Sequence, residues 1–118
     1  MIITLPYPPK ELMPNRKNGK NWKSTHQIKK DSCNTAYFLT KTIKDIHLVK
    51  FDGLIALTIT FAQIGKRNRD LDGLLSASKN MLDGVAKALG IDDSQFEPIT
   101  IKRAYIKGES ATIIEIED

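Results

Sequence analysis

The segment from Lys66 to Leu74 (Lys-Arg-Asn-Arg-Asp-Leu-Asp-Gly-Leu) places two acidic residues among three basic ones. Asp70 and Asp72 are two residues apart, and in an extended stretch alternate side chains point the same way. Two adjacent carboxylates repel each other unless a cation holds them together, and Mg²⁺ suits them because it is a hard ion that prefers oxygen ligands. Bound Mg²⁺ can polarise a phosphoryl group and activate water. Asp70 and Asp72 are therefore candidate metal ligands and catalytic residues.

The same residues also have plain structural interpretations. Asp72 is well placed to be the N-cap of a following helix, and Asp70 could pair with Arg69 or Arg67. The basic residues Lys66, Arg67 and Arg69 either neutralise the aspartates or hold a polyanion beside a metal. The segment alone leaves both interpretations open.

Lys79 extends the candidate site along the next helix. It lies seven residues after Asp72, which at 3.6 residues per turn returns it to nearly the same helix face. A lysine there could stabilise negative charge that develops on a phosphate. The alternative is an ordinary solvated lysine.

Asp92 and Asp93 follow the end of that helix, in the stretch Asp92-Asp93-Ser94-Gln95. A helix that runs back over a sheet would carry them away from Asp70. They join the first pair only if the helix kinks or breaks, and Gly84 is the candidate position because glycine is poorly suited to a helix interior. The alternative is a plain turn, which this sequence also favours.

The elements that must position these residues follow from hydrophobic periodicity. Apolar residues that alternate with polar ones predict strands, and apolar residues three or four apart predict helices. The expected strands are residues 2–5, 55–61, 99–106 and 111–116, and the expected helices run from Thr25 to Asp45 (stripe Ala36, Leu39, Ile43, Ile46) and from Asp72 to Leu89. Residues 107–110 suit a hairpin between the last two strands. The order β-α-β-α-β-β predicts one α+β domain over residues 1–118, with both helices on one face of a mixed sheet.

Composition excludes several other chemistries. The chain has 118 residues, is 41% hydrophobic and 27% charged, and carries one cysteine and two histidines. These values are ordinary for a globular protein. A single cysteine, Cys33, excludes an internal disulfide and a multi-cysteine zinc site. We expect Cys33 to be a core residue within the first predicted helix. His26 and His47 are isolated, and no glycine-rich phosphate loop is present.

Charge is unevenly distributed within a net charge of +4. Glu11 is the one acid among residues 1–30, which are rich in lysine and arginine. Residues 6–24 show no apolar period and predict a long basic loop. Its residues Arg16, Lys17, Lys20 and Lys23 are expected to bind a phosphate backbone.

No apolar run is long enough to span a bilayer. The apolar residues 1–5 lack a basic segment before them and a cleavage pattern, so they do not read as a signal peptide. We expect a cytoplasmic protein without a membrane partner.

Four pieces of the chain, in this order and spacing, resemble one known family. They are Ile3-Thr4-Leu5-Pro6-Tyr7-Pro8-Pro9, Arg69-Asp70-Leu71-Asp72, Lys79 with Asp83-Gly84, and Leu89-Gly90-Ile91-Asp92-Asp93-Ser94-Gln95. The family is the RusA family of crossover junction endodeoxyribonucleases, or Holliday junction resolvases, commonly encoded by phages and prophages. Two positions depart from its pattern: Gly73 stands where the family usually has Asn, and Ser76 where its best-known branch has the lysine.

The resemblance implies a function and a site. It implies that Asp70, Asp72 and one of Asp92 and Asp93, with Asp93 favoured, bind Mg²⁺, and that Lys79 is the catalytic lysine. It also implies a homodimer, which suits the approximate two-fold symmetry of a four-way junction.

We therefore predict a Mg²⁺-dependent endonuclease that resolves four-way DNA junctions by phosphodiester hydrolysis, with no small-molecule cofactor. The basic cluster around Arg69 would contact the DNA. The alternatives are a non-catalytic branched-DNA-binding protein on the same scaffold, and a Mg²⁺ nuclease that acts on flaps or RNA.

Overall fold

The secondary structure follows the predicted order. The strands are β1 (Ile2–Leu5), β2 (Ile55–Ile64), β3 (Phe96–Ile106) and β4 (Ala111–Ile116), the helices are α1 (Trp22–Lys41) and α2 (Leu71–Leu89), and the short 3₁₀ turns are η1 (Lys10–Leu12), η3 (Ile46–Leu48) and η4 (Asp93–Gln95). These bounds come from a computed structural model, which describes residues 1–14, 22–65 and 69–117, with residues 22–24 described by their backbone alone.

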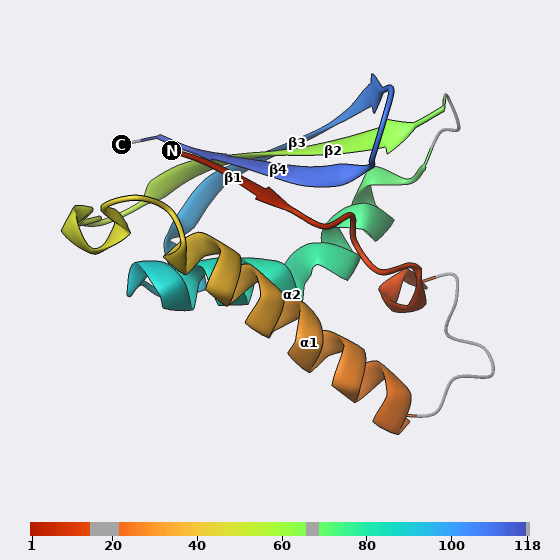
Figure 1. Ribbon diagram of the computed structural model, residues 1–118, viewed down its shortest axis with the longest axis horizontal. Coiled ribbons are helices and arrows are strands. Elements are labelled where there is room, and N and C mark those ends of the chain that lie inside the picture. Colours follow the sequence, from red (N-terminus) through yellow and green to blue (C-terminus); the bar gives the residue numbers. More distant parts are fainter. Residues whose placement is uncertain (15–21, 66–68, 118) are drawn as a thin grey trace.

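The molecule has two layers (Figure 1). The four strands form one mixed sheet, and α1 and α2 both lie against the same face of it. The strand order is β1-β4-β2-β3, in which β4 is antiparallel to both neighbours and β3 is parallel to β2. The predicted α+β class, with two helices on one face of a mixed sheet, is confirmed.

The predicted hairpin between the last two strands is wrong. Residues 107–110 connect β3 to β4, but β2 lies between these two strands and pairs with both. The reason is the β2-α2-β3 crossover. A helix between two strands returns the chain to the starting edge of the sheet, so β3 runs parallel to β2. The chain then crosses over β2 and adds β4 on its other side.

The core lies between the sheet and the helices, where alternate side chains of β2 pack against α2. Leu57, Ile59 and Phe61 point toward the helices and are at most 1% exposed, as are Leu74 and Val85 of α2. Burial of each such side chain contributes roughly 1.5–3 kcal/mol. This core holds α2 against the sheet and thereby fixes both ends of the candidate site.

Helix α1 ends at Lys41, four residues earlier than predicted. The Thr42 hydroxyl donates to the carbonyl oxygen of Leu39 (2.7 Å), and Asp45 adopts a left-handed backbone with φ 59°. Ile43 and Ile46 therefore lie beyond the helix, and Leu39 is 38% exposed. The predicted helical stripe was therefore wrong at Ile43 and Ile46: Ile46 is buried and Ile43 packs against the core, but they do so from the segment that follows the helix.

Cys33 is not a core residue. Its side chain is half-buried, and Lys87 of α2 donates to its sulfur at 3.9 Å. Cys33 thus lies at the rim of the α1–α2 contact.

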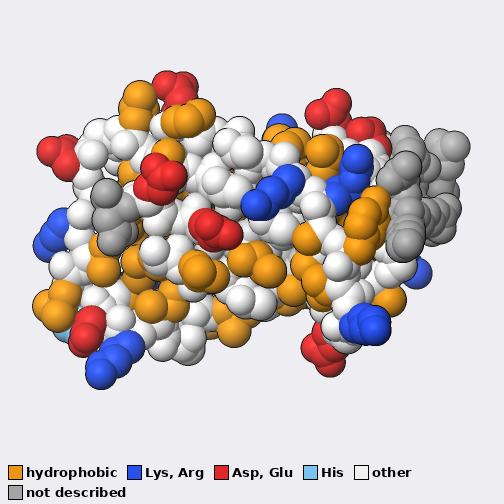
Figure 2. Space-filling view, turned by 90° about the horizontal axis from the view of Figure 1, so that it is seen from above, with side chains coloured by type: hydrophobic (Ala, Val, Ile, Leu, Met, Phe, Trp, Pro, Cys, Tyr) orange, Lys and Arg blue, Asp and Glu red, His pale blue; other side chains and the backbone are white. Residues whose placement is uncertain are grey.

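The other face of the sheet carries no described helix. Thr58 of β2 and Ile113 and Glu115 of β4 are accessible on this face, whereas Thr60 and Ala62 of β2 are buried. Figure 2 views the molecule from this side and shows hydrophobic side chains interspersed with charged ones of both signs. The predicted site residues lie on α2 and the turn after it, so the candidate site is described on the helical side.

Candidate functional site

The start of α2 positions the first pair of aspartates. Asp70 is the N-cap: its carboxylate accepts from the backbone N–H of Asp72 at 3.2 Å, and its carbonyl accepts from Leu74 N–H at 3.0 Å. The interpretation of Asp72 as the N-cap is therefore wrong. Both aspartates are solvent-exposed, and one carboxylate oxygen of Asp70 is used in the cap, so the remaining oxygens can accept other ligands.

Arg69, which immediately precedes this pair, is held at its backbone and at its side chain. Nη1 of Arg103, on β3, donates to the carbonyl oxygen of Arg69 at 2.6 Å. The Arg69 guanidinium lies over the ring of Tyr7, 5.9 Å from its centroid. The Tyr7 hydroxyl in turn donates to Oε1 of Gln63 at 3.5 Å, and burial raises the pKa of Tyr7. Sequence reasoning missed Arg103, because only the parallel pairing of β2 and β3 brings it near this bend.

One face of α2 then carries charged residues along its length. Lys79 and Asp83 follow Asp72 by seven and eleven residues, which at 3.6 residues per turn places each of them within about 20° of the direction of Asp72. Asp72 and Lys79 are exposed and Asp83 is partly exposed. The predicted placement of Lys79 on the face of Asp72 is consistent with this continuous helix.

The C-terminal end of α2 forms a second acidic group. Gly90 ends the helix in the left-handed region with φ 73°. Asp92 then caps η4, accepting from Ser94 N–H at 3.0 Å while Gln95 accepts from Asp92 N–H at 3.0 Å. This capping box is the structural turn that the sequence offered as the alternative interpretation, and it leaves Asp93 as the residue whose side chain is not used in the cap.

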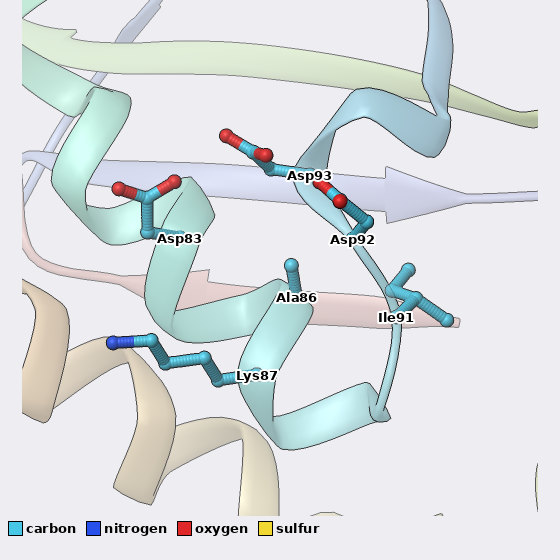
Figure 3. Close-up of a pocket in the computed structure, with 6 residues that line it drawn as sticks. All are labelled: Asp83, Ala86, Lys87, Ile91, Asp92 and Asp93. Atoms are coloured by element: carbon cyan, nitrogen blue, oxygen red, sulfur yellow. The ribbon is translucent and has the colours of Figure 1, made fainter.

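Asp93 and Asp83 share the cavities beside α2. One cavity of about 330 Å³ is lined by Asp83, Ala86, Lys87, Ile91, Asp92 and Asp93, and Figure 3 shows the side chains of Asp83 and Asp93 on its two sides, from α2 and from the following turn. A neighbouring cavity of about 360 Å³ adds Lys79 to Asp83 and Asp93, above apolar residues of α2 and β3. The sequence indicates Asp83 only as part of a motif with Lys79 and Gly84, whereas the structure places it opposite Asp93.

The carboxylates of this group affect one another. The pKa of Asp93 is raised, chiefly because its protonated form shares a hydrogen bond with Asp83, and further because of Asp92. The pKa of Asp92 is lowered, chiefly by the hydrogen bond from the backbone of Ser94 and then by Asp93. Negative charge is thus concentrated around Asp93, and a bound cation would relieve it.

The two acidic groups do not meet within one chain. Helix α2 continues from Leu71 to Leu89 without a break, and 19 residues of α-helix span roughly 28 Å. The helix does not break at Gly84 as expected: it continues past this residue, and Gly84 is buried against the backbone of α1. Among the residues that the structure describes, no three His, Cys, Asp or Glu side chains are arranged to hold one metal ion. Asp70 and Asp72 therefore share no ion with Asp92 or Asp93 of the same chain.

Most of the predicted DNA-binding residues lie outside the described part of the chain. This applies to Arg16, Lys17, Lys20, Lys66 and Arg67, and to the side chain of Lys23. Arg69 is described, and it lies beside the aspartates as predicted.

Comparison with protein-family models and with curated proteins gave no match. Within the described residues, none of the helices combines the length and the apolar character needed to cross a lipid bilayer.

Proposed function

We propose that this protein is a Mg²⁺-dependent endonuclease that cuts four-way DNA junctions and acts as a homodimer. The observation that supports it most directly is the charged line along α2. Asp70 and Asp72 stand at its start, Lys79 in its middle, and Asp83 with Asp93 at its end. Carboxylates and a lysine on one exposed helix face suit a site that handles a metal ion and a phosphate together.

The donor set at the start of α2 fits Mg²⁺. This ion is commonly bound through one or two carboxylates, with water and substrate phosphate completing its shell. Asp70 and Asp72 supply two exposed carboxylates, and the cap uses only one of their oxygens. Mg²⁺ would supply Lewis-acid stabilisation of the phosphoryl group and an activated water.

Two basic residues, Arg69 and Lys79, would bind the DNA phosphate and stabilise the charge that develops on it. Arg69 lies directly beside the carboxylate pair, where its guanidinium can hold a DNA phosphate by paired hydrogen bonds. Lys79 lies about two turns further along the same helix face, and its ammonium would offset the negative charge that develops during cleavage. Neither residue needs to move a proton for these roles.

A two-fold dimer would unite the two acidic groups. If the α2 helices of two protomers lie antiparallel, the start of one helix comes close to the end of the other. Asp70 and Asp72 of one protomer would then be near the partner's Asp93. The carboxylate of Asp92 is already used in the cap of η4. The same symmetry offers two sites to the equivalent strands of a junction.

We place this activity in the cytoplasm.

The test is a panel of four substrates at one salt concentration: a four-way junction, a flap, a duplex and an RNA of matched sequence, each with and without Mg²⁺. We expect Mg²⁺-dependent cleavage of the junction. Binding without cleavage would instead indicate a non-catalytic branched-DNA-binding protein, and preferential cleavage of the flap or the RNA would indicate a nuclease with another substrate.

Two variants assign the activity to the site. Asp70→Asn and Asp72→Asn should abolish cleavage and largely preserve junction binding, because binding depends on the lysines and arginines. Cleavage by Asp70→Asn at the wild-type rate would remove this site from the proposal.

A further inference from the structure

Arg103 is separated from the candidate site by 34 residues of sequence but touches it in space. It belongs to β3, where it pairs in register with Phe61 of β2. Strand β2 ends three residues later, at Ile64, and α2 begins at Leu71. The Arg103 side chain is exposed and reaches the segment before α2, where its Nη1 donates to the carbonyl oxygen of Arg69 at 2.6 Å.

The hydrogen bond from Arg103 reaches the main chain next to Asp70, rather than a side chain. A hydrogen bond from a charged donor is stronger than one between neutral groups, and the carbonyl of Arg69 belongs to the peptide group that joins Arg69 to Asp70. The bond therefore fixes the position from which the Asp70 side chain starts. Within the described residues, it uses one of the five N–H donors of Arg103.

A second contact holds the other side of the same residue. The Arg69 guanidinium lies over the Tyr7 ring, and Tyr7 is anchored through its hydroxyl to Gln63, which is 3% exposed. Arg103 of β3 therefore fixes the backbone of Arg69, and Tyr7 fixes its side chain. Loop residues that carry site groups need such support, because small displacements of a ligand weaken its metal and substrate contacts.

We propose that Arg103 is a positioning residue for the Asp70–Asp72 carboxylate pair, acting through its hydrogen bond to the main chain of Arg69. This inference rests on the proposed function, since it assigns to the pair a role in binding a divalent cation. It adds a residue from β3 that no motif of the α2 region contains.

The experiment measures Mg²⁺ binding directly by NMR, following the backbone amide of Asp72 during titration of the DNA-free full chain. Arg103→Gln should raise the Mg²⁺ concentration at half-saturation by roughly tenfold or more, the usual scale for loss of a supporting contact at a metal site. Arg103→Lys should restore part of the affinity, because an ammonium can still donate to the carbonyl. Thermal unfolding of each variant, compared with wild type, reports any general loss of structure.

Lys102→Gln is the matched control. Lys102 is the exposed neighbour of Arg103 on β3, and its alternation along the strand directs it to the opposite face of the sheet. Its loss removes the same charge and should leave Mg²⁺ binding unchanged. Equal Mg²⁺ affinity in wild type and Arg103→Gln would overturn the inference, and so would an equal loss in Lys102→Gln. If the wild-type amide of Asp72 does not respond to Mg²⁺ at all, the metal site of the proposed function fails instead.

Discussion

Gly84 of α2 lies directly against the backbone of Cys33 in α1. A Cβ atom at Gly84 would collide with the carbonyl oxygen of Cys33, and would lie 3.0 Å from both Cβ of Ala36 and the backbone nitrogen of Tyr37. The two helices can approach this closely only because the glycine has no side chain. This contact sets the position of α2, and therefore of the charged residues along its outer face.

Gly84→Ala should destabilise the protein by about 1–3 kcal/mol or more, because the extra methyl group meets rigid backbone on α1. Gly73→Ala is the control on the same helix, since its Cβ would meet Pro14 Cδ at an ordinary 3.6 Å. That change should be neutral or stabilise by up to about 1 kcal/mol through helix propensity. Urea unfolding measures both, and equal stability of the two variants would contradict the packing described for Gly84.

Asp70 caps α2, and we propose that it also binds Mg²⁺; two substitutions separate these roles. Asp70→Ala removes the helix cap and should cost about 1 kcal/mol of stability. Asp70→Asn keeps a capping oxygen for the N–H of Asp72, so its free energy of unfolding should stay close to wild type, whereas both variants should lose cleavage. Thermal unfolding alongside the junction assay checks this. If activity follows stability across the two variants, the carboxylate has no role beyond the cap.

Lys79→Ala should lower kcat by about 10²–10³-fold, the scale for loss of a single electrostatic contact to the transition state. KM for the junction should change little, because under the proposed function the other cations would provide most of the binding. Lys44→Ala, at an exposed lysine in the turn after α1, is the control and should cleave like wild type. A wild-type kcat in Lys79→Ala would remove this lysine from the mechanism and leave its simple solvated interpretation.

The pKa of Asp93 is raised in the folded chain, so the folded state binds this proton more tightly than the unfolded state. Its contribution to stability is present at low pH and is lost as the pH rises through the raised pKa. Asp92, whose pKa is lowered, acts in the opposite sense and loses its contribution as the pH falls through that lowered value. Asp83→Asn should return the pKa of Asp93 toward its ordinary value, as followed by the carboxyl ¹³C shift. An unchanged titration would show that Asp83 does not interact with it.

A site shared between protomers predicts complementation. Asp70→Asn and Asp93→Asn should each be inactive as homodimers. After the two are unfolded together and refolded, activity should return to roughly a quarter of wild type, because half of randomly formed dimers are mixed and one of their two sites is intact. Continued inactivity, with mixed dimers confirmed by native mass spectrometry, would contradict a site built across the dimer.

The local elements could be predicted from the sequence because their signals are local. Alternation in residues 55–61 predicts β2, and the apolar spacing that ends at Gly90 predicts α2 almost to the residue. The nearness of Asp70, Asp72 and Arg69 also follows from adjacency along the chain. In each case the interacting groups lie within a few bonds or one helical turn, so side-chain type and spacing suffice.

Only the tertiary structure decided how distant segments meet. It placed β2 between β3 and β4 in spite of a good turn sequence at 107–110, and it assigned Gly84 to helix packing rather than to a kink. It also brought Arg103 to Arg69 and Asp83 to Asp93, while it separated the two acidic groups by the length of α2. Strand order and helix contact are set by the packing of the whole core, a sum over many residues that no short pattern contains.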